Sequence, residues 1–96
     1  MRAEDGTTAR CRVTIVNGRG LHARAAAKFV KLVSGFDAEV TVVKKDTEVP
    51  GSSILGLMML AAAPGCQLEL RASGPMAEEV IAALAALIAN RFDEDR

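Results

Sequence analysis

Apolar residues recur along this chain with two different periods, and glycine or proline separates most of the segments that carry them. Alternation of apolar and polar residues predicts strands over residues 11–16, 38–43, 47–49 and 67–72. Apolar residues at helical spacing predict helices over residues 22–34, 54–62 and 75–90. The order strand, helix, strand, strand, helix, strand, helix favours an α+β fold, an antiparallel sheet with its helices on one face.

The length and the apolar content predict one domain. A chain of 96 residues, half of them apolar, is long enough to bury a single modest core. Residues 1–9 are expected to be a disordered polar tail, residues 10–92 the domain, and residues 93–96 a charged end that frays. No apolar run reaches the roughly 20 residues of a membrane span, and the polar start is no secretory signal. We therefore expect a cytoplasmic protein without membrane insertion.

The charge balance and the aromatic content argue against nucleic acid as a partner. The 12 basic and 12 acidic side chains give no net charge, whereas binding to a phosphate backbone needs a basic surplus. The chain has 3 phenylalanines and no tryptophan or tyrosine, too few for a base-stacking surface. The two cysteines, Cys11 and Cys66, are expected to be free and largely buried thiols, because nothing indicates secretion.

The only histidine, His22, follows a glycine turn and begins the alanine-rich first helix. The backbone N–H groups of a helix start lack intrahelical acceptors, and the helix dipole is positive there, so the position favours an anion. The N–H groups of Ala23 and Arg24 could cradle such an anion, and the Arg24 side chain could add a charge-assisted hydrogen bond. A nucleophilic nitrogen beside an anion site indicates a residue that is phosphorylated and then gives the phosphate away. The alternative, a surface or capping histidine, is the commoner role for a single histidine near a helix start.

Two segments resemble the HPr family, the histidine-containing phosphocarriers of the phosphoenolpyruvate-dependent phosphotransferase system. Residues 20–24 (GLHAR) and 26–30 (AAKFV) are similar to the active-site signature of that family. Residues 52–60 (SSILGLMML) are similar to its regulatory-serine segment, in the right order and separation. The resemblance extends from about residue 11 to about residue 88. It implies an open-faced β-sandwich with the sheet order first, fourth, second, third strand and three helices on one face.

The resemblance implies a carrier role for His22, with the phosphate on Nδ1 and Arg24 as its charge partner. Phospho-Enzyme I would phosphorylate His22, which would pass the group to a histidine on an Enzyme IIA-type acceptor. Such a carrier needs no metal and no organic cofactor, and it is not an enzyme with a substrate of its own. A hydrolase fits less well, because the sequence offers one histidine and no evident set of nucleophile, base and acid.

The resemblance also implies regulation through Ser53, or less strongly Ser52, by an HPr kinase/phosphorylase. Gly51 and Ser52 stand where the family often has leucine and lysine, so this part of the resemblance is incomplete. A serine before an apolar helix is most often an N-cap, and a phosphate at a helix start is also electrostatically favoured, so both roles can hold. An alternative function therefore stays open, a serine-phosphorylated regulatory interaction module without a carrier role.

A partner surface is expected around the second helix, which is more apolar than a short surface helix needs. By the resemblance, its members are Ile54, Leu55 and Met58 from that helix and Ala27, Lys28, Phe29 and Lys31 from the first. Ala25 stands where many members of the family have proline. This departure fits the nitrogen-related branch of the system, or a bacterium without a full sugar-transport set. We expect a monomer.

Overall fold

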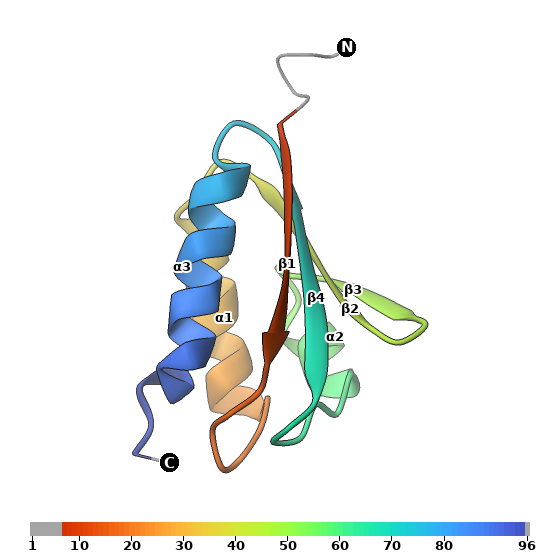
Figure 1. The fold of residues 1–96 in the computed structure, drawn as a ribbon, viewed down its shortest axis with the longest axis vertical. Helices are drawn as coiled ribbons and strands as arrows, with labels where there is room; N and C mark the ends of the chain where they lie inside the picture. The colour runs from red at the N-terminus through yellow and green to blue at the C-terminus, as the bar shows by residue number, and fades with distance from the viewer. Residues whose placement is uncertain (1–6, 96) are drawn as a thin grey trace.

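The computed structural model describes residues 7–95, in which a four-stranded antiparallel sheet carries the helices on one face (Figure 1). The sheet order is β1-β4-β2-β3, as the family resemblance implies. The elements are β1 (Thr8–Thr14), α1 (Ala23–Ser34), β2 (Glu39–Lys44), β3 (Thr47–Pro50), α2 (Ile54–Met59), β4 (Gln67–Ser73), α3 (Ala77–Ala89) and a short turn (Arg91–Asp93). The predicted α+β class and the predicted element order are both confirmed.

The sheet has one apolar and one polar face, because side chains alternate along each strand. In the central strand β4, Leu68, Leu70 and Ala72 are buried in the core. The residues between them face the opposite side, where the Arg71 guanidinium lies 3.1 Å from the Glu69 carboxylate. The helices therefore have a single apolar face on which to pack.

α1 and α3 lie side by side over this apolar face and run in opposite directions (Figure 1). α1 buries a stripe at helical spacing, formed by Ala25, Ala26, Phe29 and Val33. The shorter α2 buries Leu57 alone among its own residues. None of the helices within residues 7–95 is long and apolar enough to cross a membrane.

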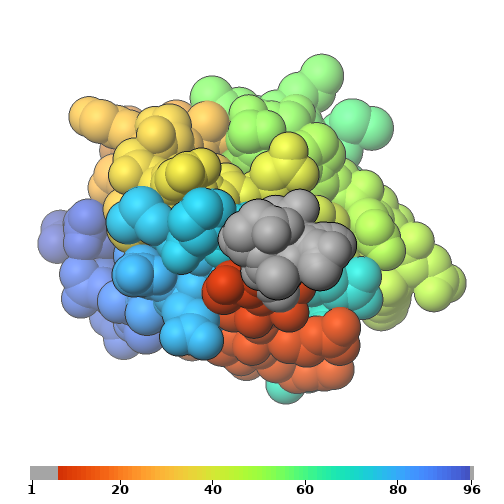
Figure 2. Space-filling view, turned by 90° about the horizontal axis from the view of Figure 1, so that it is seen from above, coloured from red at the N-terminus to blue at the C-terminus, as the bar shows by residue number. Residues whose placement is uncertain are grey.

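The antiparallel arrangement of α1 and α3 brings the start of α1 and the end of α3 to the same end of the molecule (Figure 1). Figure 2 looks onto the opposite end, where the loops that precede β2 and α3 meet. There the N–H of Met76 donates to the carbonyl oxygen of Asp37 at 3.0 Å. His22 and the C-terminal segment thus share one end of the domain.

The start of β1 and the end of α2 differ most from their predicted positions, and each difference has a local reason. β1 begins at Thr8, inside the predicted tail, because Thr8 pairs with Ser73 at the end of β4. Most of that predicted tail, residues 1–6, lies outside the described residues. α2 ends at Met59 rather than at residue 62, and Ala61 just beyond it has a left-handed φ of 52°.

The two cysteines are free, as predicted, but they are only half-buried rather than largely buried. Cys11 lies on β1, which forms one edge of the sheet. Cys66 lies in the loop immediately before β4. A sheet edge and a strand end both leave part of a side chain uncovered.

The C-terminal segment differs most from its prediction as a frayed, charged end. After α3 the chain passes through Arg91, Phe92 and Asp93, whose φ angles of 59°, 53° and 62° are left-handed. Each such non-glycine residue costs roughly 1–2 kcal/mol. Burial of Phe92, which is 0% exposed, offsets this cost, and Lys28 Nζ donates to the Phe92 carbonyl oxygen at 2.6 Å. The segment up to Glu94 therefore belongs to the folded domain.

We predict that Phe92→Ala lowers the free energy of unfolding by about 3–5 kcal/mol, the usual cost of emptying a buried phenylalanine site. Met59→Ala is the matched control, because Met59 is 74% exposed and should change stability by no more than about 0.5 kcal/mol. Urea unfolding of both variants measures the difference. Equal stabilities would mean that the C-terminal segment does not pack as described.

Candidate functional site

The loop before α1 is fixed against the loop that follows α2. The N–H of Leu21 donates to the carbonyl oxygen of Ala62 at 2.9 Å, and the N–H of Gly20 donates to Asn17 O at 3.1 Å. Gly20 has a φ of +68°, and a Cβ atom built there would lie 2.4 Å from the Ala62 oxygen. Only glycine allows the backbone at position 20 to lie this close to Ala62, and the loop held in this way leads directly to His22 at the start of α1.

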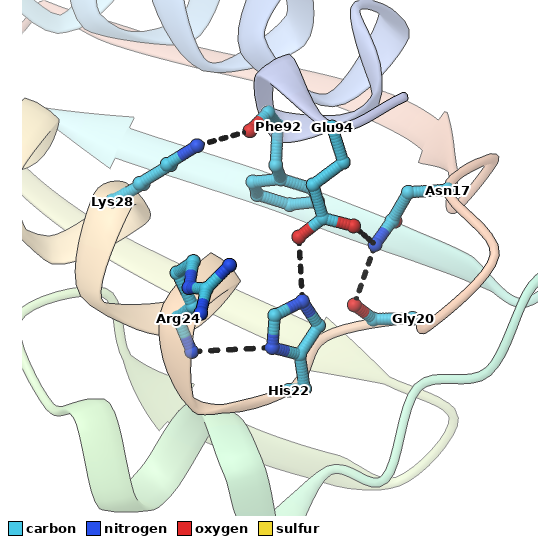
Figure 3. A network of polar contacts seen from close by, with 7 residues as sticks. All are labelled: Asn17, Gly20, His22, Arg24, Lys28, Phe92 and Glu94. Atoms are coloured by element: carbon cyan, nitrogen blue, oxygen red, sulfur yellow. Dashed lines mark hydrogen bonds and ion pairs between the residues drawn. The ribbon is translucent and has the colours of Figure 1, made fainter. Parts of the chain in front are cut away.

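His22 is the N-cap residue of α1. Its backbone is extended, with φ −82° and ψ −178°, and its carbonyl oxygen accepts the first helical hydrogen bond, from Ala26 N at 2.8 Å. The Nδ1 atom of the ring accepts a hydrogen bond from the N–H of Arg24 at 3.2 Å (Figure 3). The imidazole therefore does what a serine or aspartate side chain usually does at this position. The capping role weighed from the sequence is confirmed, and it leaves Nδ1 without a proton.

The other ring nitrogen of His22 faces the C-terminal segment. Nε2 lies 2.5 Å from Oε2 of Glu94 (Figure 3). Because Nδ1 accepts a hydrogen bond, the proton of a neutral ring is on Nε2, which donates it to the Glu94 carboxylate. The imidazole is thus held at both nitrogens, with a lone pair on Nδ1 directed toward the helix start.

Asn17 completes this contact from the loop. Its side chain is fully buried, and Nδ2 donates both to Gly20 O at 2.8 Å and to Oε1 of Glu94 at 3.0 Å. Its Oδ1 atom is buried with no hydrogen-bond partner among the described residues. Asn17 therefore acts through the two N–H bonds of its side-chain amide. One stabilises the turn through the Gly20 carbonyl oxygen, and the other binds the Glu94 carboxylate.

Sequence reasoning missed both Asn17 and Glu94. The sequence patterns give Asn17 no role, and they place Glu94 only in a charged end. No periodicity or motif marks either residue, because the contact joins positions 72 residues apart, His22 and Glu94, through the packing of α3 beside α1. The only signal in the sequence is that Asn17 lies in the short loop that leads to the single histidine.

The environment of Glu94 favours its ionised form. Partial burial raises the pKa of Glu94. Hydrogen bonds from Asn17 and His22, the positive charge that His22 carries when it is protonated, and the charge of Lys28 together lower this pKa by more. The net result is a pKa below the ordinary value of a glutamate. Glu94 is accordingly a carboxylate at neutral pH, and it is an acceptor for the Nε2 proton.

An open pocket of mixed charge adjoins His22. The cationic side chains of Arg19, Arg24 and Lys28 line it together with the acidic residues of the C-terminal segment, Asp93, Glu94 and Asp95. His22 itself is half-buried, with its side chain 24% exposed. Of the two residues predicted to cradle an anion, Arg24 donates its N–H to Nδ1 of His22 and has an exposed side chain, and Ala23 is exposed as the first residue of α1, so the cradle stays a prediction. Within residues 7–95 no cluster of histidine, cysteine and acidic side chains could hold a metal ion.

The predicted partner surface is exposed on α2 and only partly available on α1. Ile54, Leu55 and Met58 are 42%, 69% and 41% exposed. On α1, Ala27 and Lys31 are exposed, whereas Lys28 is half-buried and bonded to the C-terminal turn. The inclusion of Phe29 is wrong: it is 1% exposed, because it lies on the stripe of α1 that faces the core.

Ser53 is the N-cap of α2, and its Oγ accepts a hydrogen bond from the N–H of Gly56 at 2.9 Å. This capping role is one of the two predicted for it. Ser52 is exposed and precedes the helix. The glycine at position 51 has a steric reason, since a Cβ atom there would lie 2.8 Å from the Val40 side chain.

We predict that Gly20→Ala destabilises the protein more than Gly65→Ala. Both glycines have positive φ, +68° and +90°, so both substitutions carry the backbone cost of about 1–2 kcal/mol. Only position 20 adds a clash, because a Cβ atom at Gly65 meets nothing within 4 Å. Chemical unfolding of the two variants tests this, and equal losses would show that the loop is not held against Ala62.

Comparison with known proteins identifies a family whose members carry a phosphorylation site. A family model described as "PTS HPr component phosphorylation site" matches residues 9–90. Phosphocarrier protein NPr of Escherichia coli (strain K12) is 46% identical over 84 residues, which cover 86% of this chain and 93% of the relative. Phosphocarrier protein HPr of Neisseria meningitidis serogroup A is 49% identical over 82 residues, which cover 85% of this chain and 92% of the relative.

Solved structures match as well. HPr-C-His from Thermoanaerobacter tengcongensis has a TM-score of 0.87 at 39% identity and covers 92% of this chain and 99% of that one. A structure of an HPr dimer from the same organism has a TM-score of 0.72 at 41% identity and covers 85% of this chain and 94% of that one. That dimer weakens the expectation of a monomer. The match of the family model and the identity of these relatives show that the chain belongs to the HPr family of phosphocarrier proteins.

Proposed function

We propose that this protein is a phosphocarrier in which Nδ1 of His22 accepts a phosphoryl group from phospho-Enzyme I and passes it to an Enzyme IIA-type acceptor. Membership of the HPr family supports a carrier role in the phosphotransferase system. The carrier is used stoichiometrically and is not an enzyme with a small-molecule substrate. The finer assignments, which are the atom, the donor and the acceptor, rest on the arguments that follow.

The observation that carries the proposal is the hydrogen bond from the N–H of Arg24 to Nδ1 of His22, 3.2 Å long. It supports Nδ1 as the nitrogen that has no proton, and the lone pair that accepts this hydrogen bond is directed toward the positive end of the α1 dipole. The lone pair forms the bond to phosphorus as the bond between phosphorus and the donor breaks. The Arg24 N–H then loses Nδ1 as its acceptor, and a phosphate oxygen takes its place.

The surroundings of His22 suit a phosphoryl group that is received from one protein and passed to another. Its side chain is 24% exposed, so a donor and an acceptor can both reach it. The side chains of Arg19, Arg24 and Lys28 line the adjoining pocket and supply positive charge for a phosphoryl group. Positioning and charge stabilisation of this kind are the main contributions that a protein makes to phosphoryl transfer.

The apolar surface of α2 is proposed to bind both partners. Leu55 is the most exposed of the three predicted members on that helix, and α2 packs beside α1, whose first residue follows His22. We place this exchange in the cytoplasm, where a phosphoenolpyruvate-dependent system operates. Relatives named NPr and HPr match this chain at similar identity, and Ala25 in place of proline leads us to propose the nitrogen-related branch.

Regulation by phosphorylation of Ser53 is a second proposal, and it involves the start of α2, where Ser53 is the N-cap. The Ser53 hydroxyl caps the helix through Gly56 N, so a kinase must release that hydrogen bond before it transfers phosphate. Ser52 is more exposed and has no such role in the helix. Exposure supports modification at Ser52, whereas the family resemblance supports Ser53.

We expect intact protein to gain one phosphate when it is mixed with Enzyme I, Mg²⁺ and phosphoenolpyruvate. The group should be acid-labile, absent from His22→Ala and retained in Ser53→Ala, because a phosphoramidate hydrolyses in acid and a phosphoserine does not. Intact mass and site mapping measure this. A competent Enzyme I from the same organism that transfers no phosphate would refute the carrier proposal, and the serine-regulated module would then be the better reading.

Leu55→Glu should slow transfer from Enzyme I and to the acceptor by about tenfold, because it places a charge in an apolar contact. Stability should change by no more than about 0.5 kcal/mol, since Leu55 is 69% exposed. Thr14→Glu is the control, because Thr14 is exposed next to the buried Val13 on β1 and the substitution adds the same charge on the face of the sheet away from the helices. If both variants transfer phosphate equally fast, α2 is not the docking surface.

A further inference from the structure

We propose that Glu94 is a positioning residue for His22: it fixes the proton on Nε2 and faces the positive charge that the ring gains when Nδ1 is phosphorylated. The inference rests on the proposed function and deepens it. Its basis is the contact of 2.5 Å between Oε2 of Glu94 and Nε2 of His22, which joins the C-terminal segment to the start of α1. Neither the sequence pattern nor the names of the relatives assign a role to this residue.

The charge balance of the transfer step shows what Glu94 does. The Nδ1 lone pair forms the N–P bond, and the electron pair of the broken bond stays with the donor. Nε2 keeps its proton, so the imidazole ring becomes positively charged while the phosphoryl group carries the negative charge. The Glu94 carboxylate already accepts the Nε2 proton, and this hydrogen bond strengthens as the ring becomes cationic. Glu94 therefore stabilises the phosphorylated ring more than the free ring.

The same contact assists release of the phosphate. When the acceptor takes the phosphoryl group, the N–P electron pair returns to Nδ1 and the ring is neutral again. A ring fixed with its proton on Nε2 cannot rotate or exchange the roles of its two nitrogens, so Nδ1 is ready for the next donor. Glu94 thus acts through His22 and does not touch the phosphoryl group.

The structure holds Glu94 in place more firmly than an exposed chain end requires. Asn17, fully buried, donates to Oε1 at 3.0 Å and leaves Oε2 for the ring. The left-handed turn that precedes Glu94 is fixed by the buried Phe92 ring and by the Lys28 ammonium. Backbone strain of this kind persists only where the surrounding contacts determine it, and it is concentrated at functional sites.

Neighbouring acids do not share this position. Asp93 accepts a hydrogen bond from Asn90 Nδ2 at 2.7 Å and so is used within the turn itself. Asp95 is exposed and lies next in the chain to Glu94. Asp95→Asn therefore removes the same charge from the same segment without removing the acceptor of the Nε2 proton, and it is the matched control.

The test compares Glu94→Ala, Glu94→Gln and Asp95→Asn with the unaltered protein by two measurements. The first is the ¹H resonance of the Nε2 proton of His22, which a hydrogen bond to a carboxylate shifts downfield and protects from exchange with water. The second is the rate of phosphoryl transfer from phospho-Enzyme I. A purely structural role for Glu94 would lower the unfolding midpoint but would not move the proton signal of molecules that remain folded.

We expect the unaltered protein and Asp95→Asn to show the protected Nε2 proton. Because Asp95 lines the same pocket, the transfer rate of Asp95→Asn gives the effect of removing one negative charge from that pocket, and the Glu94 variants are compared with it. Glu94→Ala should lose the proton signal and slow transfer by about tenfold or more, the order expected when a hydrogen bond to a charged partner is removed. Glu94→Gln keeps the shape and an acceptor oxygen but lacks the charge. Glu94→Gln should slow transfer while the protein keeps its unfolding midpoint. This variant keeps the proposal testable if Glu94→Ala detaches the C-terminal segment from the domain.

The proposal is overturned if Glu94→Ala and Glu94→Gln retain the proton signal and transfer as fast as Asp95→Asn. It is also overturned if the unaltered protein shows no protected Nε2 proton. Failure of the carrier proposal would look different: the unaltered protein would take up no phosphate at all. The proton signal would then still decide whether Glu94 positions the ring.

Discussion

The arrangement of the site depends on one imidazole ring that is held at both nitrogens. The N–H of Arg24 donates to Nδ1, and Nε2 donates to the carboxylate of Glu94. The first contact exists because His22 is the N-cap of α1, and the second because α3 ends beside the start of α1. Helix capping and the packing of two antiparallel helices together define the tautomer, and in the proposed carrier the tautomer would define which nitrogen accepts the phosphoryl group.

The rest of the domain brings these contacts together. A sheet with one apolar face leaves the helices a single packing surface, so α1 and α3 lie side by side and their ends meet. The glycine at position 20 allows the loop to approach Ala62, two residues before His22 caps α1. Burial of Phe92 stabilises a left-handed turn that would otherwise be unfavourable, and this turn directs Glu94 back toward the ring.

Much of the fold could be predicted from the sequence, because strand alternation and helical spacing are local properties. The element order and the position of His22 at a helix start both follow from such patterns. Glu94 and Asn17 could not be predicted, since their roles arise from contacts between distant segments and from a turn that uses no glycine. Phe29 was misassigned to the surface because a signature shows which residues occur together, but not which side of the helix faces the core.

The central claim is that Nδ1 of His22 is the atom that carries the phosphate. The most direct test is ³¹P–¹⁵N NMR of the uniformly ¹⁵N-labelled protein after phosphorylation, which identifies the nitrogen bonded to phosphorus. The account predicts coupling of phosphorus to Nδ1, with the proton retained on Nε2. Coupling to Nε2, or phosphate on any residue other than His22, would contradict it, because Nε2 is the nitrogen that the Glu94 carboxylate engages.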